Sequence, residues 1–314
     1  MLSALASADL VMWISICVKA LVYATTLMAA GSILTLLTLR SLPVREVQSL
    51  KWLAVCCAVM AAVLSFARLP LRASFLMGGT WQGGIDPMML ALVWDSPLGT
   101  SIGLRLIGLG FILLILVPGR AGRGLAALGA CIVALSFVLR GHALEEPRLI
   151  LGALITLHIL GVAFWIGAFV PLYRVAGGTN QRIAGTIAHE FGNNALWVVG
   201  LLTGVGAITL WILTGNIFKA LYTPYGQFFA LKLTIFSAVM GFAAWNKLRL
   251  TPALLNQDQS ACTKLRQSVR LEATLIGAIL ITTAALTTVS APEKSDQIET
   301  ASAFLTPNRR IPTD

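Results

Sequence analysis

Long apolar stretches, separated by short polar ones, follow one another along most of the chain. A helix needs about 20 predominantly apolar residues to cross the hydrocarbon core of a membrane, and eight stretches approach or exceed that length. They cover residues 9–39, 50–75, 100–117, 124–139, 148–174, 190–214, 226–248 and 268–289. The pattern therefore predicts an all-α fold, a polytopic transmembrane helical bundle of about eight spans.

The composition supports this prediction. Of the 314 residues, 57% are hydrophobic and 11% are charged, whereas a soluble domain has about 25% charged residues. So few charges argue against a soluble enzyme, a nucleic-acid-binding domain and a disordered chain. The net charge of +10 does not change this conclusion, because basic residues gather in the cytoplasmic loops of membrane proteins. We therefore expect contact with membrane lipid and no nucleic-acid partner.

The loops between the predicted spans alternate between rich and poor in lysine and arginine. The four richer loops hold Arg40, Arg45 and Lys51, then Arg120 and Arg123, then Arg174 and Arg182, and finally Lys247, Arg249, Lys264 and Arg266. Loops of this kind stay in the cytoplasm, so both termini are predicted on the outer side, the periplasm in a bacterium. Residues 1–291 would then form the bundle and residues 292–314 a polar periplasmic tail.

The longest outer segment, residues 73–99, is rich in glycine and proline. These residues argue against a continuous helix. The segment also carries Trp81 and Trp94, aromatic residues of the kind that sit at the level of the lipid headgroups. We expect a lid-like loop that rests on the outer face.

Ionisable side chains inside a span are costly and point to function. Arg105, His158 and Lys232 lie about five to ten residues into spans that enter from the outer side, which puts them at similar depths. Three such groups together predict a polar cavity open to the outer side, where an acidic residue such as Asp95 would offset their charge.

The histidines suggest a metal. His142 falls in an outer loop and His158 in the span below it, so these two can approach one another. Met88 and Met89 are predicted on the same side, either as further ligands or as simple apolar contacts. Imidazole and thioether groups suit copper, and the thioether favours Cu(I) over Cu(II). Trp165 shares a helix face with His158 through the i, i+3, i+7 spacing.

Several short motifs resemble those of the copper resistance protein D family (CopD, also called PcoD). The histidine, apolar run and Trp-x-Gly of residues 158–167 are similar to the signature of that family. Further similar elements are Gly141–His142–Ala143, Leu201–Leu202–Thr203–Gly204, Tyr225–Gly226 with Leu231–Lys232, and Asn246–Lys247 leading to Thr251–Pro252. The combination covers about residues 140–252, a CopD-like core.

The resemblance implies a bacterial inner-membrane protein of eight helices that transports or handles copper and is not an enzyme. It also implies a small periplasmic copper-binding partner of the CopC type, which delivers copper to the outer face. His142, alone or with Met88 and Met89, would receive copper, and His158 would hold it deeper beside Trp165. Tyr225, Lys232 and Asn246 would order the polar network. The sequence has no GxxxxGK[ST] motif, which excludes ATP-driven pumping by this chain.

Two alternatives stay open at this point. The first is a b-type haem protein of electron transfer, with His142 and His158 as haem ligands and Arg105 and Lys232 beside the propionates. Basic side chains suit haem propionates better than they suit a copper ion. The second is a scaffold that tethers a partner, in which the polar residues are structural.

Overall fold

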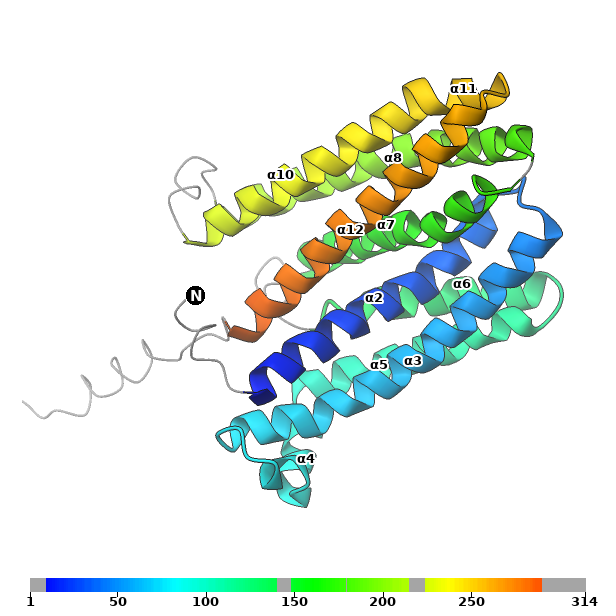
Figure 1. Cartoon of the computed structure of the whole chain (residues 1–314). Helices are drawn as coiled ribbons and strands as arrows, with labels where there is room; N and C mark the ends of the chain where they lie inside the picture. The colour runs from blue at the N-terminus through cyan, green and yellow to red at the C-terminus, as the bar shows by residue number, and fades with distance from the viewer. Residues whose placement is uncertain (1–9, 140–147, 179, 215–223, 290–314) are drawn as a thin grey trace, which may run out of the picture.

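The computed structural model describes residues 10–139, 148–178, 180–214 and 224–289, and every regular element in these ranges is helical (Figure 1). His142 and the predicted tail at 292–314 lie outside the described residues. The elements are α2 (Leu10–Thr38), α3 (Val44–Leu76), η1 (Gln82–Gly84), α4 (Pro87–Trp94), α5 (Pro97–Leu113), η2 (Leu114–Leu116), α6 (Arg120–Leu135), α7 (Arg148–Val175), α8 (Gln181–Thr214), α10 (Pro224–Trp245), η4 (Asn246–Leu250), α11 (Thr251–Leu255) and α12 (Gln259–Val289).

Six helical segments in the described part of the chain are long and apolar enough to cross a membrane. They are Leu10–Thr38, Val44–Leu76, Pro97–Leu116, Arg148–Val175, Gln181–Thr209 and Ser260–Thr288. An all-helical, multi-pass membrane protein is therefore confirmed. The two other predicted spans, at 124–139 and 226–248, correspond to α6, which has 16 residues, and to α10. They are helices but are not among the six, so the count of eight stays a prediction.

Three helices begin well before the apolar stretch that predicted them. α3 starts at Val44, α8 at Gln181 and α12 at Gln259, each six to nine residues early. The added turns are polar, and in α12 they include Lys264 and Arg266. Hydrophobicity marks where a helix meets lipid, whereas its start depends on local capping and packing.

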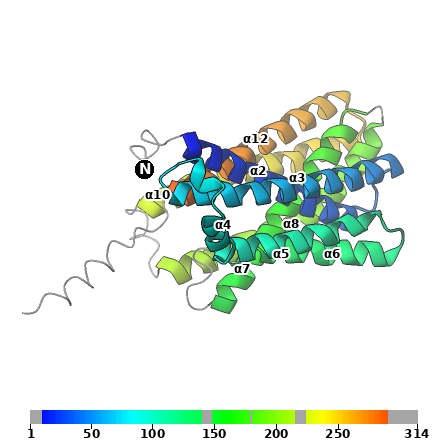
Figure 2. The same ribbon diagram turned by 90° about the horizontal axis from the view of Figure 1, so that it is seen from below.

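The helices form one bundle of roughly parallel rods. α2 packs against α3, α6, α7 and α12, and so it joins the first half of the chain to the second. In the first half α5 lies beside both α3 and α6, which Figures 1 and 2 both show. In the second half α7 packs on α8 and α12, and α10 packs on α12.

Glycine allows α2 and α7 to approach closely. A Cβ atom built on Gly31 would overlap the carbonyl of Ala163, and one built on Gly167 would overlap the backbone of Gly31. Small residues at helix contacts of this kind permit backbone approach within membranes. Gly167 therefore forms a close helix contact, and its partner is the first spanning helix.

Short connections rich in basic residues gather at one end of the bundle, here called the basic end. It contains the links from α2 to α3, from η2 to α6, from α7 to α8 and from α11 to α12 (Figure 1). The carboxylate of Glu190 accepts hydrogen bonds from the backbone N–H groups of Arg40 at 2.7 Å and Ser41 at 3.0 Å. Glu46 pairs with Arg174 at 3.2 Å. These contacts fix the first loop to α8 and α3 to α7.

The opposite end, here called the α4 end, is capped by the segment predicted as a lid-like loop. The segment is not a continuous helix, as expected, but it is more ordered than a loop, because η1 and α4 lie within it. Asp86 caps α4 by accepting a hydrogen bond from the Met89 N–H at 2.8 Å, and Pro87 occupies the first turn, where its missing N–H costs nothing. A small apolar cluster holds α4 against α3 and α5: Ala73, Val93, Leu98 and Ile102.

The close approach of α2 and α7 generates a stability prediction. We expect Gly167→Ala to destabilise the protein by about 1–3 kcal/mol, because the added methyl group has to push two helix backbones apart. Gly200→Ala is the matched control, since a Cβ there meets nothing within 4 Å and alanine favours the helix. The midpoint of thermal unfolding in detergent, followed by tryptophan fluorescence, should fall for the first variant alone. Equal midpoints would contradict the packing.

Candidate functional site

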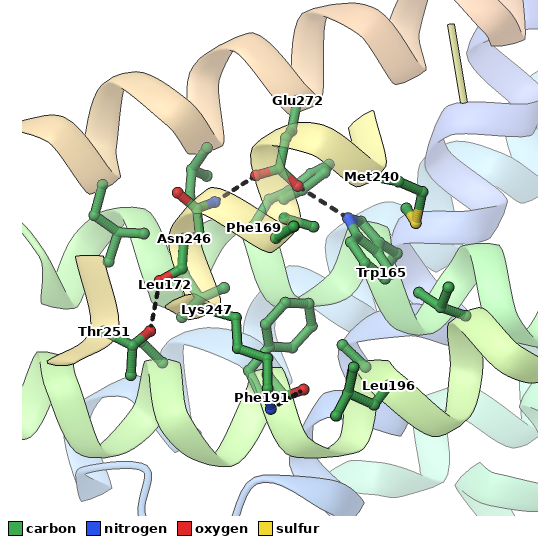
Figure 3. Close-up of a pocket in the computed structure, with 18 residues that line it drawn as sticks. Trp165, Phe169, Leu172, Phe191, Leu196, Met240, Asn246, Lys247, Thr251 and Glu272 are labelled. Atoms are coloured by element: carbon green, nitrogen blue, oxygen red, sulfur yellow. Dashed lines mark hydrogen bonds between the residues drawn. The ribbon is translucent and has the colours of Figure 1, made fainter. Parts of the chain in front are cut away.

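A carboxyl group is buried between three helices of the second half. Glu272 of α12 is 3% exposed, and Trp165 of α7 is equally buried. The Trp165 Nε1–H donates to Oε2 of Glu272 at 3.2 Å, and the Asn246 Nδ2–H donates to Oε1 at 2.6 Å (Figure 3). Ser268, one turn earlier in α12, donates to Oε1 at 3.4 Å. Glu272 thus links α7, η4 and α12 through neutral donors.

Local structure positions each donor. The Trp165 ring packs edge-on against Phe191 of α8, with 5.6 Å between centroids, which fixes the direction of its N–H. Asn246 opens η4, a five-residue π-helix. Pro252 follows it and lacks the N–H that an α-helix would pair with the carbonyl of Leu248, so the widened turn has a clear cause. π-Helical turns are frequent at functional sites.

A cavity of about 290 Å³ lies beside this network, between α7, α8, α10, η4 and α12. Its walls are largely apolar, and Glu272 contributes the one acidic side chain among the described residues that line it. Polar groups at the cavity come mainly from Glu272, Asn246, Lys247 and Thr251. The principal apolar and aromatic lining residues are Trp165, Phe169, Leu172, Phe191, Leu196 and Met240.

Lys247 lines the cavity on the side of the basic end. Its ammonium group donates to the carbonyl of Gly192 at 2.9 Å and to Oδ1 of Asn193 at 2.7 Å. The amide of Asn193 lies 3.1 Å from Nε2 of His189 on the same helix. The ammonium is therefore held against α8.

Arg105 belongs to a different polar cluster, in the first half of the chain. Its side chain is 2% exposed, Nε donates to Oγ of Ser136 at 3.1 Å, and the guanidinium lies 4.6 Å from the Phe137 ring centroid. Ser101 donates to the carbonyl of Ser136 at 2.6 Å. These contacts brace α5 against the end of α6, which is a structural use of the arginine.

The other predicted site residues are spread over the bundle. His158 is exposed on α7, and the face it shares with Gly161 and Trp165 lies against α8, where a Cβ on Gly161 would press on Leu202. Met88 is 81% exposed on α4, and Met89 packs on the small apolar cluster. Asp95 is exposed at the C-terminal cap of α4.

The structure therefore brings together Trp165 and Asn246 of the predicted set, and it leaves Met88, Met89, Asp95 and Arg105 apart from them. α4 packs on α3 and α5, whereas α7 packs on α2, α8 and α12. Tyr225 and Lys232 fall in α10, but their side chains lie outside the description, as does the whole of His142. Within the described ranges, no three His, Cys, Asp or Glu residues are grouped as a metal site would need.

Sequence reasoning missed Glu272. A signal existed, because Glu272 is the acidic residue that stands well inside a predicted span, whereas Asp9 and Glu190 stand at the boundaries of theirs. The predicted polar cavity rests on one histidine and two basic residues alone. A buried carboxylate is as costly as a buried ammonium and calls for the same attention.

Two family models match the chain. Residues 7–149 match the model described as "Copper resistance protein D-like, N-terminal domain", and residues 185–286 match the model described as "Copper resistance protein D". Searches of curated proteins and of solved structures returned no match.

The first match covers the first half of the bundle, and the second covers the second half except α7 and the two ends. The first contains α2 to α6, and the second contains most of α8 and α12 with α10, η4 and α11 between them, including Asn246 and Glu272. The motif at 158–167, on which the resemblance largely depended, lies between the matched segments. Because both models describe one family and together cover most of the bundle, the chain belongs to the copper resistance protein D family, a family of multi-pass inner-membrane proteins that handle copper.

Proposed function

We propose that this protein moves copper across the inner membrane and receives it on the periplasmic side, at the α4 end. Membership of the copper resistance protein D family carries this proposal. A cavity inside the membrane bundle with a few polar groups in its largely apolar walls supports it, because a transported ion needs groups that replace its hydration shell. The cavity beside Glu272 offers such groups from three helical elements, α12, η4 and α11.

Copper would be received by His142 and His158, with the thioethers of Met88 and Met89 as softer ligands nearer the surface. The exposure of Met88 on α4 supports this role, since a receiving group has to be reached by the donor. Thioether and imidazole ligands suit Cu(I). A small periplasmic protein of the CopC type would be the donor and would dock at the α4 end.

The cavity would be the next binding site that copper reaches. It lies nearer the basic end than His158 does, because Trp165 follows His158 by two helical turns along α7, about 10 Å. The carboxylate of Glu272 attracts a cation there, and Trp165 and Asn246 hold that carboxylate in place. Copper would thus pass from soft ligands near the periplasm to an oxygen ligand deeper in the bundle.

The proposal includes a topology. The basic end faces the cytoplasm, as the positive-inside rule requires, and α6 and α10 cross the membrane with the six candidate spans. Both termini then lie in the periplasm together with the tail at 292–314.

Reporter fusions test this topology through the parity of the crossings. We expect a cytoplasm-active fluorescent protein fused after Gly119, Gly178 or Gln257 to report the same side at all three positions. Gly119 and Gly178 share a side when both α6 and α7 cross, and Gly178 and Gln257 share a side when both α8 and α10 cross. Alkaline phosphatase, active in the periplasm, should give the opposite readout. Reversal of the signal at Gly178 alone would exclude α6 and α10 as spans.

Replacing His158 tests the copper path. We expect His158→Gln to reduce copper accumulation by cells to the level of a strain without the protein, because imidazole is lost where copper is received. Thr156→Ala is the matched control, since the Thr156 hydroxyl donates within its own helix, to the carbonyl of Gly152. Copper per cell, measured by mass spectrometry at equal protein levels in the membrane, gives the readout.

Unchanged accumulation by the His158→Gln variant would refute the assigned role. The same purified proteins also test the haem alternative. A Soret band in wild-type protein that His158→Gln abolishes would support a b-type haem protein in place of a copper permease.

A further inference from the structure

A second pocket, here called the arginine pocket, lies at the basic end between the first turns of α3 and the last turn of α7. The residues that line it are Val44, Arg45, Gln48, Ser49 and Trp52 of α3 and Arg174 of α7. Both helices pack on α2, which lies between them (Figure 1). Most of the lining side chains are exposed, so the arginine pocket is open to the surroundings of the bundle.

The polar side chains of the arginine pocket are available to a ligand. In the described part of the chain, Arg45, Gln48 and Ser49 form no side-chain hydrogen bond and no ion pair. Arg174 uses its Nε, which lies 3.2 Å from Oε2 of Glu46, and its terminal N–H groups form no hydrogen bond to the described residues. Glu46 thus offsets one of the two guanidinium charges, and a positive charge with several N–H and O–H donors remains.

These donors suit a phosphate group. A guanidinium presents its N–H groups in a planar fork that matches phosphate oxygens, and hydroxyl and amide groups add neutral donors. In membrane proteins, basic pockets between spanning helices on the cytoplasmic side bind the headgroups of anionic lipids. The arginine pocket is of this kind, because arginines from two candidate spans meet there at the basic end.

The depth of the arginine pocket also fits a lipid headgroup. The apolar stretch of α3 begins at residue 50, and Arg45 stands five residues before it, which is about 8 Å along the helix. The polar headgroup region is about 5–8 Å deep on each side of the hydrocarbon core. Arg45 is therefore at the level of the phosphates, whereas Trp52 lies at the boundary with the hydrocarbon, where tryptophan is enriched.

One face of α3 continues from the headgroup level into the hydrocarbon. Arg45, Trp52, Val59 and Val63 share this face, because they follow one another at intervals of seven, seven and four residues. All four side chains are exposed in the bundle. An acyl chain that starts from a headgroup in the arginine pocket can therefore follow the apolar part of the same face.

We propose that the arginine pocket binds the headgroup of an anionic phospholipid, whose acyl chain lies along the exposed face of α3. Arg45 and the terminal N–H groups of Arg174 hold the phosphate, and Gln48 and Ser49 donate to the remaining headgroup oxygens. The bound lipid joins the beginning of α3 to the end of α7 and so adds to the pair of Glu46 and Arg174. This inference is independent of copper transport, since it requires only that the bundle stands in a membrane.

The charge of the arginine pocket selects among phospholipids. Its excess positive charge attracts a headgroup with a net negative charge, such as that of phosphatidylglycerol. Phosphatidylcholine has the same phosphate, but its quaternary ammonium group would meet the arginines, and the carboxylate of Glu46 is already paired with Arg174. Inorganic phosphate has the charge without the acyl chains. A comparison of these three ligands therefore separates headgroup charge, phosphate and chain.

Native mass spectrometry of the full-length protein in a neutral detergent tests the site, because it counts the lipids bound to the intact protein. In a titration with phosphatidylglycerol, we expect Arg45→Gln to weaken the tightest binding step about fivefold, the contribution of one basic residue at an anionic headgroup. Arg123→Gln is the matched control, because Arg123 is an exposed arginine at the basic end that stands outside the pocket. Equal affinities of the wild-type and Arg45→Gln proteins, or equal weakening by both substitutions, would overturn the proposal.

Ser49→Leu separates a shaped pocket from a diffuse effect of charge. The substitution removes one donor and narrows the pocket without a change in net charge, and leucine favours the helix. We expect it to weaken the same binding step about threefold, which corresponds to the loss of one hydrogen bond. An unchanged affinity, in a protein whose thermal unfolding midpoint shows that it is folded, would exclude the pocket as the binding site.

The three ligands identify the source of the phosphate. Phosphatidylcholine with the same acyl chains should bind the wild-type protein more weakly. An excess of inorganic phosphate should leave phosphatidylglycerol bound, because the free anion lacks the contact with α3. Equal binding of phosphatidylcholine would indicate a lipid held by its chains alone, and displacement by inorganic phosphate would indicate a site for free anions; either result contradicts the proposal. Copper flux does not enter these measurements, so a failure of the lipid site and a failure of copper transport are distinguishable.

Discussion

The hydrogen bonds to one buried carboxylate organise the second half of this protein. In a membrane interior a charge without partners is expensive, and Glu272 obtains its donors from α7, η4 and its own helix. Each donor in turn requires local structure, namely a tryptophan held by Phe191 and an asparagine at the start of a π-helix. The π-helix before Pro252 thus positions Asn246 at the site. The cavity lies between the same helices.

The α2–α7 contact connects this site to the rest of the bundle. The glycines at 31 and 167 bring the two backbones together, and Trp165 lies only two residues from that contact. The position of the tryptophan N–H therefore depends on packing against the first half of the chain. The contact thus links the first family segment to the helix that carries the Trp165 donor.

Periodicity and hydropathy predicted the architecture well, because lipid imposes a strong and simple length requirement on a spanning helix. They could not predict α4, whose eight residues are too short for such a signal and whose stability comes from the Asp86 cap and the cluster around Val93. Trp165 and Asn246 were predicted from the family motifs. Both donate to Glu272, which lies 107 positions from Trp165 and 26 from Asn246, and no short sequence pattern links residues so far apart. Glu272 itself is recognisable in the sequence as an acidic residue inside the span at 268–289, but the predicted site does not include it.

The charges explain why the predicted cavity and the observed one differ. Arg105, His158 and Lys232 predicted a basic cavity in the outer half, yet a cation is repelled by arginine and lysine. The buried guanidinium of Arg105 bonds Ser136 and lies over Phe137, so its positive charge is used to brace two helices. The carboxylate, in contrast, stands at the wall of a cavity with neutral donors behind it. Among the described residues, the acidic group inside a span is therefore the one that lines a cavity, whereas the buried arginine serves helix packing.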